Sequence, residues 1–221
     1  MNISIFDVIG PVMIGPSSSH TAGAARFARA AAMLCASKFD EVRFSLHGSF
    51  ALTGEGHGTH EALLGGALGL EADDERIKGA FALAEKQGVK AVFDNVEMPD
   101  AHANSARIAF YCENDKKCEV EGSSIGGGRI LITGINGCKV QLSCERPTLI
   151  ITQRDEPGVV SEITGHLAHG GINIALMQVT RKEKGKTACT VIETDSDIPI
   201  SVKQELEKAD NIISVQILDM K

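Results

Sequence analysis

The segment from residue 148 to residue 221 constrains the fold of this chain most, because its hydrophobic pattern alternates between strand and helix in one recognisable order. Period-2 alternation is typical of strands, and apolar residues at i, i+3 and i+4 are typical of helices. The expected elements are strand 149–152, helix 159–168, strands 172–180 and 187–193, helix 200–208 and strand 212–218. This βαββαβ order is that of the ferredoxin-like fold.

The pattern of polar and apolar residues changes near Glu145-Arg146-Pro147, where Pro147 makes a plausible short linker. Before that point, short strands and helices alternate with polar, glycine-rich loops. We therefore predict an α+β protein of two domains, with a mixed α/β domain over residues 1–145 and a ferredoxin-like domain over residues 148–221.

A polar stretch at residues 10–23, GPVMIGPSSSHTAG, precedes an alanine-rich helix that we expect to end near Lys38. Two Gly-Pro turns bracket a short apolar segment, and the stretch then presents four hydroxyls and one imidazole at the start of the helix. One residue is enough to cap a helix, so the stretch indicates a site for a carboxylate or phosphate at the positive end of the helix dipole. The alternative is helix capping within a solvated loop. The residues concerned are Ser17, Ser18, Ser19, His20 and Thr21.

Three more polar loops follow, at residues 54–60, 100–107 and 123–128. The first, GEGHGTH, has too many glycines to be an element by itself, and its glycines allow close approach of the backbone to a ligand. We expect the four loops to converge in space. The last of them has an alternative interpretation as a tight turn between two strands.

His57 lies between two glycines of the loop at residues 54–60. Neutral imidazole is the usual proton carrier near pH 7, so we predict that His57 is an acid/base group or a substrate ligand. A histidine that only caps the following helix is the alternative, and we assign that structural role to His60. The remaining histidines, His47, His166 and His169, are predicted to lie on polar faces.

The loop at residues 100–107 contains His102, Asn104 and Arg107. A guanidinium group is a planar, bidentate donor that suits a substrate carboxylate. A surface salt bridge explains Arg107 equally well. Both interpretations of Arg107 stay open at the level of the sequence.

Composition excludes several classes of function. The formal net charge of −7 disfavours nucleic acid or an anionic membrane as a partner, and the absence of Trp with a single Tyr removes base-stacking platforms. No window reaches the length of a membrane span, and the N-terminus has no signal-peptide pattern, so we expect a cytoplasmic protein. Six cysteines contain no CxxC pair and match no metal-site spacing, which favours buried or edge-strand thiols and no metal ligands.

Four motifs, GPSSSHTAGAAR, GHGTH, HANSAR and GSSIGGGRI, occur in an order that resembles the β subunit of iron-sulfur-dependent L-serine dehydratases. The later DEPG and GINI motifs resemble an ACT domain. The first resemblance implies an α subunit that carries a [4Fe-4S] cluster on its own cysteines, and conversion of L-serine to pyruvate and ammonia without pyridoxal phosphate. It also implies that this chain alone is inactive.

The resemblance assigns provisional roles to the residues. His20 and His57 are the expected catalytic groups, and Ser17, Ser18, Ser19, Thr21, His102, Asn104 and Arg107 are the expected substrate-binding groups. In the ACT domain, Asp155, Gly158 and Asn173 occupy positions where the family binds small effectors, often amino acids, between two paired domains. Helix capping, close packing and strand-end hydrogen bonds are the structural alternatives for these three.

A second resemblance suggests an alternative function without catalysis. The first domain resembles the allosteric substrate-binding domain of some phosphoglycerate dehydrogenases, so the chain could serve as a regulatory subunit that senses an amino acid. ACT domains commonly pair, and we therefore predict self-association through residues 148–221.

Overall fold

The computed structural model describes residues 12–220 and divides the chain into two compact units, one up to Asn136 and one from Gly137 onward. The Gly10-Pro11 turn of the first polar stretch lies outside the described residues. The predicted domain limits at 145 and 148 stay a prediction. Each unit is described below by itself.

Five strands of the first unit lie in the order β2-β1-β3-β4-β5. Strands β1 and β2 are parallel, and the other neighbouring pairs are antiparallel. Their bounds are β1 Glu41–Gly48, β2 Lys90–Asn95, β3 Asn104–Cys112, β4 Asp115–Gly126 and β5 Arg129–Ile135.

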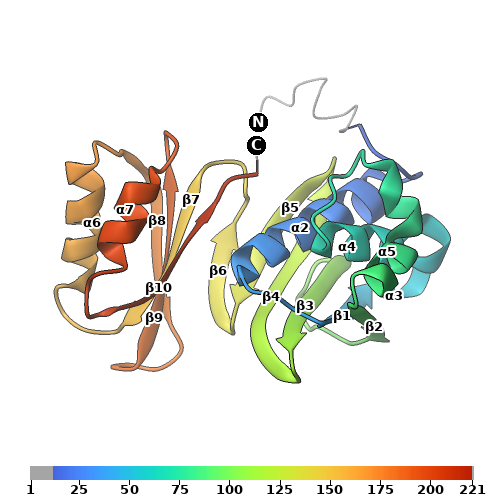
Figure 1. Ribbon diagram of the computed structural model, residues 1–221, viewed down its shortest axis with the longest axis horizontal. Coiled ribbons are helices and arrows are strands. Elements are labelled where there is room, and N and C mark those ends of the chain that lie inside the picture. The colour runs from blue at the N-terminus through green and yellow to red at the C-terminus, as the bar shows by residue number, and fades with distance from the viewer. Residues whose placement is uncertain (1–11, 221) are drawn as a thin grey trace. The chain divides into compact units, whose positions relative to one another are not determined.

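Helices cover one face of this sheet, with α2 and α4 lying across it (Figure 1). Alternation along β1 explains the covered face, because Val42 and Phe44 are fully buried while Arg43 between them is exposed. The helical segments are η1 Ser18–Gly23, α2 Ala24–Cys35, α3 Ser49–Thr53, η2 Glu55–His57, α4 Thr59–Ala67, η3 Glu75–Gly79 and α5 Ala80–Lys86. The segment η1 is a single π-helical turn, and η2 and η3 are 3-10 turns.

Glycine allows α2 and α4 to approach each other closely. A Cβ atom at Gly66 would lie 2.1 Å from the carbonyl oxygen of Ala25, so no larger residue fits between the two backbones. The alanine-rich sequence of α2 has the same effect, since five of its six alanines are buried with little side-chain bulk between the helices.

Several local predictions were wrong. The segment GEGHGTH is not a loop throughout: η2 occupies residues 55–57 and α4 begins at Thr59. Strand β3 begins at Asn104, which places Asn104 and Arg107 in the sheet, and β4 includes Ser123. In both strands, pairing with a neighbouring strand continues into the polar residues, because backbone hydrogen bonds do not depend on side-chain polarity.

The second unit has the predicted ferredoxin-like fold. Its four-stranded sheet has the order β10-β7-β9-β8, and α6 and α7 pack on one face (Figure 1). The bounds are β6 Cys138–Leu142, β7 Thr148–Arg154, α6 Val159–His169, β8 Ile174–Arg181, β9 Thr187–Thr194, α7 Ile200–Leu206 and β10 Ile212–Leu218. Its core combines buried aliphatic residues of the sheet with Ile163 and Leu167 of α6.

Among residues 12–220, no helix combines the length and the apolar character needed to cross a membrane.

Candidate functional site

The turn that follows β1 builds the framework of the site. Gly48 has a positive φ of 57°, and a Cβ atom there would lie 2.5 Å from the carbonyl oxygen of Ala103. The next residue, Ser49, donates its backbone N–H to the same carbonyl at 2.6 Å. The start of α3 and the loop before β3 are therefore held in direct contact by a position that only glycine can occupy.

His20 projects from η1 toward α3. Its Nε2 atom lies 3.0 Å from Oγ of Ser49 and 3.2 Å from Oγ1 of Thr53. The single hydroxyl hydrogen of Thr53 is donated to the carbonyl of Ser49 at 3.0 Å, so Oγ1 of Thr53 accepts from the imidazole. Phe50 contacts the ring edge-on, with centroids 5.3 Å apart.

The electrostatic surroundings favour the neutral form of His20. Partial burial lowers the pKa of His20 from its ordinary value, because the imidazolium loses hydration, and a positive charge on His57 lowers that pKa further. The two imidazole centroids are only 5.0 Å apart. His20 is thus suited to hydrogen bonding in the neutral state.

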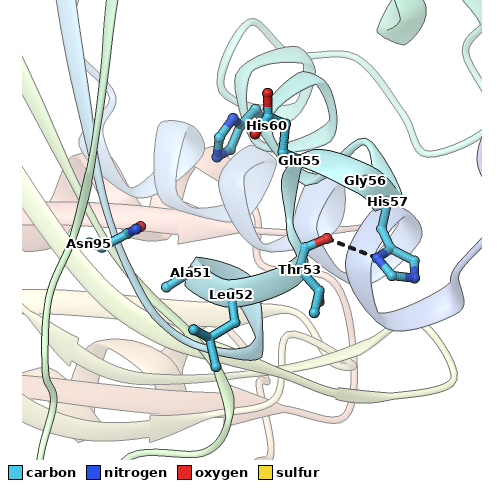
Figure 2. A pocket seen from close by; sticks show the side chains of 8 residues that line it. All are labelled: Ala51, Leu52, Thr53, Glu55, Gly56, His57, His60 and Asn95. Atoms are coloured by element: carbon cyan, nitrogen blue, oxygen red, sulfur yellow. Dashed lines mark hydrogen bonds between the residues drawn. The ribbon is translucent and has the colours of Figure 1, made fainter.

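His57 is fixed through one of its ring nitrogens. Its Nδ1 atom lies 2.8 Å from the backbone carbonyl of Thr53, as Figure 2 shows. A carbonyl can only accept, so Nδ1 carries the hydrogen and, in neutral imidazole, the lone pair lies on Nε2. The residue is exposed. Nε2 of His57 is therefore available as a base.

Other residues of the polar stretch at residues 10–23 position the backbone of His20 and His57. Ser17 caps η1, and its Oγ accepts the backbone N–H of His20 at 3.1 Å. Thr21 is buried and donates its hydroxyl to the carbonyl of His57 at 3.3 Å. Ser18 and Ser19 are half-buried within η1. The hydroxyls of Ser17 and Thr21 therefore act on the backbone that carries the two histidines.

The third polar loop reaches the site through its backbone. Nδ1 of His102 accepts the N–H of Asn104 at 3.1 Å, and the carbonyl of His102 accepts the hydroxyl of Ser105 at 2.6 Å. Asn104 stands opposite Gly48 in the sheet. His102 and Asn104 are brought next to the start of α3, although the ring of His102 is exposed and is bonded within its own loop.

Arg107 lies in β3 and forms an ion pair with Glu121 of the neighbouring strand β4. Nε of Arg107 is 2.8 Å from Oε1 of Glu121, directly opposite on β4. Both side chains are about 40% exposed, at 41% and 39%. This geometry is that of the surface salt bridge considered above, while a role of Arg107 in substrate binding stays a prediction.

The fourth polar loop joins the site through its serines. Oγ of Ser123 lies 2.7 Å from Oγ of the buried Ser105. On the opposite side of β4, Ser124 is fully buried against Gly23, where a Cβ atom would lie 2.0 Å from Oγ of Ser124. The four polar segments do lie together, linked by hydrogen bonds and close contacts.

Sequence reasoning missed Ser49 and Thr53, although both contact His20. The available signal was two hydroxyl residues four positions apart, directly after a strand that ends in glycine. This spacing places both side chains on one face of a helical turn. Ser105 was missed too, because β3 was expected to begin later.

His57 also borders an open pocket of about 430 Å³. The pocket is lined by side chains from α3, η2, the start of α4 and the end of β2, which Figure 2 labels. His60 lies on this pocket and packs on Phe93, with ring centroids 4.3 Å apart. Leu52 at the rim is 85% exposed.

In the second unit, the predicted effector residues have separate partners. Oδ2 of Asp155 accepts the N–H of Gly185 at 2.8 Å and pairs with Arg181 at 2.9 Å. These contacts, the hydrogen bond from Gly185 first, lower the pKa of Asp155. Asn173 donates to Asp195 at 2.6 Å. Gly158 is the N-cap of α6, with φ 94°, so Asp155 is not the cap.

The described residues contain no group of three or more His, Cys, Asp or Glu side chains that could hold a metal ion. None of the six cysteines, which all lie within the described residues, forms a disulfide; Cys35, Cys118, Cys144 and Cys189 are buried, and Cys112 and Cys138 are half-buried. Burial raises the pKa of Cys189 to about 12, so this thiol is not a ready thiolate ligand.

Comparison with known proteins identifies the family. A family model described as "Serine dehydratase beta chain" matches residues 4–88, and one described as "AHAS small subunit-like ACT domain" matches residues 149–214. The chain is 44% identical over 214 residues to the "Probable L-serine dehydratase, beta chain" of Bacillus subtilis (strain 168), with 96% of each chain covered. It is 39% identical over 204 residues to the "L-serine dehydratase, beta chain" of Peptoniphilus asaccharolyticus, with 92% of each covered.

A shorter match relates the chain to a longer protein. Over 81 residues it is 46% identical to the "L-serine dehydratase" of Streptomyces coelicolor (strain ATCC BAA-471 / A3(2) / M145), which covers 34% of this chain and 17% of that protein. The extent of the first two matches is decisive: the chain belongs to the family of L-serine dehydratase β chains, with an ACT domain in its second unit.

Proposed function

We propose that this chain is the β subunit of an L-serine ammonia-lyase, which converts L-serine to pyruvate and ammonia together with an α subunit. The observation that carries the proposal is the match to L-serine dehydratase β chains over nearly the whole length of this chain. The Streptomyces protein supports the pairing with an α subunit. In that protein, a segment similar to part of this chain is one portion of a longer L-serine dehydratase chain.

The role of this chain is to present histidines at the edge of a site that the α subunit completes. The free Nε2 of His57 is positioned to take a proton from bound substrate, while Thr53 holds the opposite nitrogen. His20, kept neutral by burial, orients the hydroxyls of Ser49 and Thr53. The segments at residues 17–21 and 102–107 supply the predicted contacts to L-serine.

The proposed cofactor is a [4Fe-4S] cluster carried by the α subunit, with no pyridoxal phosphate. The residues of this chain do not fit such a cluster, because the described residues contain no group of three or more ligand side chains and four of the six cysteines are buried. The chemistry of the cluster therefore belongs to the partner, and this chain contributes binding, orientation and proton transfer. We place the assembled enzyme in the cytoplasm.

The second unit is proposed to regulate the enzyme. Its ACT domain offers Asp155, Gly158 and Asn173 for an amino-acid effector, and its edge strand β8 exposes Leu176 and Val179, which suits self-association through this unit.

The proposal is tested by mixing this chain with its purified α chain under anaerobic conditions and measuring pyruvate formed from L-serine. We expect each chain alone to be inactive and the mixture to be active. Full activity of the α chain alone would contradict a catalytic contribution by this chain. It would favour the alternative, an amino-acid-sensing regulatory subunit.

A further inference from the structure

A second, smaller pocket lies beside His57 in the first unit, with a volume of about 230 Å³. It is distinct from the pocket of Figure 2, since it is lined by the segment at residues 14–16, by Thr21 and by η3. Ile14, Pro16 and Ile77 form its apolar walls. Its two charged groups are Glu61 and Lys78, one of each sign.

The carboxylate of Glu61 is incompletely compensated by the protein. Glu61 lies in the first turn of α4, and its Oε2 atom is enclosed with no hydrogen-bond partner among residues 12–220. The helix dipole favours an anion at this position, but it supplies no hydrogen bond to Oε2. Enclosing an unpaired carboxylate oxygen costs free energy. Because the two oxygens share one negative charge, a cation bound at either oxygen of Glu61 would offset this cost.

Lys78 supplies the opposite charge and has no ion-pair partner in the part of the chain that the structure describes. In the same 3-10 turn, Arg76 pairs with Asp74, whereas neither Lys78 nor Glu61 forms an ion pair within residues 12–220. Lys78 is exposed and borders the same pocket as Glu61. Among the described residues, the pocket thus presents one anion and one cation that form no ion pair, together with apolar walls.

We propose that this pocket binds a small zwitterionic α-amino acid, with its ammonium group at Glu61 and its carboxylate at Lys78. A molecule with a single charge would leave one of the two residues unpaired. The pocket volume and the walls formed by Ile14 and Ile77 suit a short side chain such as that of alanine or serine. This site lies in the first unit and is separate from the ACT domain.

Occupation of the pocket would act on the candidate catalytic loop. Thr21, whose hydroxyl donates to the carbonyl of His57, borders the pocket, as do His57 and Gly58. A ligand there would hold the segment from which the His57 ring projects. The site would therefore be regulatory, since a ligand held by Glu61 and Lys78 would act on His57 through the lining residues Thr21 and Gly58.

Binding is measured by calorimetry on the full chain without an α subunit, using L-alanine and L-serine as probes. Propionate and ethylammonium serve as analogues with one charge each. The variants Glu61→Gln and Lys78→Gln remove one charge of the pocket. Glu162→Gln is the matched control, because Glu162 lies in the first turn of α6, and Asp155→Asn removes the predicted effector contact in the ACT domain.

We expect saturable binding of L-alanine or L-serine that weakens about tenfold or more in each pocket variant and is retained in Glu162→Gln and Asp155→Asn. The proposal is overturned if neither amino acid binds, if propionate or ethylammonium binds equally well, or if Asp155→Asn abolishes binding while the folded pocket variants retain it. The measurement requires no lyase activity, so its failure is distinguishable from failure of the proposed function.

Discussion

The Nδ1 atom of His57 lies 2.8 Å from the carbonyl oxygen of Thr53, four residues earlier in the chain. The hydroxyl of the same Thr53 lies 3.2 Å from Nε2 of His20. One residue therefore orients both imidazoles, the first through its backbone and the second through its side chain. The positions of the two histidines depend on each other through this residue.

Replacing Thr53 by valine removes the hydroxyl and keeps the backbone carbonyl. We expect the first unit to lose about 0.5–1.5 kcal/mol of its free energy of unfolding, measured by urea titration with amide NMR signals from that unit. Thr164→Val is the matched control, because Thr164 also donates to the carbonyl four residues earlier, at 3.0 Å, but contacts no histidine in the described residues. Equal losses in the two variants would show that the contact with His20 contributes nothing.

Stability of the first unit should decrease in mild acid. The pKa of His20 is lowered in the folded chain, mainly by burial, from an ordinary value of 6.5. As the pH falls through about 6.5, the unfolded chain binds a proton at His20 before the folded chain does, so protonation favours unfolding. Urea midpoints measured between about pH 8 and pH 5 should show this decrease, and His20→Gln should make it smaller. An unchanged pH dependence in His20→Gln would show that the lowered pKa of His20 is not the cause of the decrease.

Close contact between α2 and α4 predicts a large effect at Gly66. A Cβ atom there would lie 2.1 Å from the carbonyl oxygen of Ala25, which is backbone and cannot turn away. Gly66→Ala should therefore destabilise the first unit by about 1–3 kcal/mol or more, by thermal unfolding. At Gly79 a Cβ atom would meet nothing within 4 Å, and Gly79→Ala should leave the melting temperature nearly unchanged. Similar effects of the two substitutions would contradict the described helix contact.

The pairing of Arg107 with Glu121 predicts weak coupling. Both side chains are partly exposed, so a double-mutant cycle with Arg107→Met and Glu121→Gln should give a coupling free energy of about 1 kcal/mol or less. The cycle is measured by urea unfolding. If Arg107 serves only in this ion pair, the KM for L-serine of the assembled enzyme should be unchanged in Arg107→Met, and a large increase would show that Arg107 binds the substrate carboxylate.

Much of the fold was predictable because hydrophobic periodicity reports which face of an element is buried. The order of elements in the second unit follows from short apolar runs such as that of residues 149–151 and from the periodicity of α6. The start of β3 at Asn104 was not predictable in this way, since polar residues continue a strand when a neighbouring strand supplies the hydrogen bonds.

The candidate site was only partly predictable. The loops that carry His20, His57 and His102 were recognisable from their glycines and clustered polar residues. The link through Ser49 and Thr53 was not, because it depends on the turn after Gly48, where a contact with Ala103 sets the direction of α3. Such long-range contacts leave no periodic signal in the sequence.

The rate of pyruvate formation by the assembled enzyme carrying His57→Gln tests the central claim most directly. His169→Gln is the matched control, because Nδ1 of the exposed His169 also bonds the carbonyl four residues earlier, at 2.7 Å, but in the second unit. If Nε2 of His57 transfers the proton, kcat should fall about 100-fold or more in His57→Gln and remain near the wild-type value in His169→Gln. A His57→Gln enzyme with nearly wild-type kcat, when correctly assembled with its α subunit, would contradict the account.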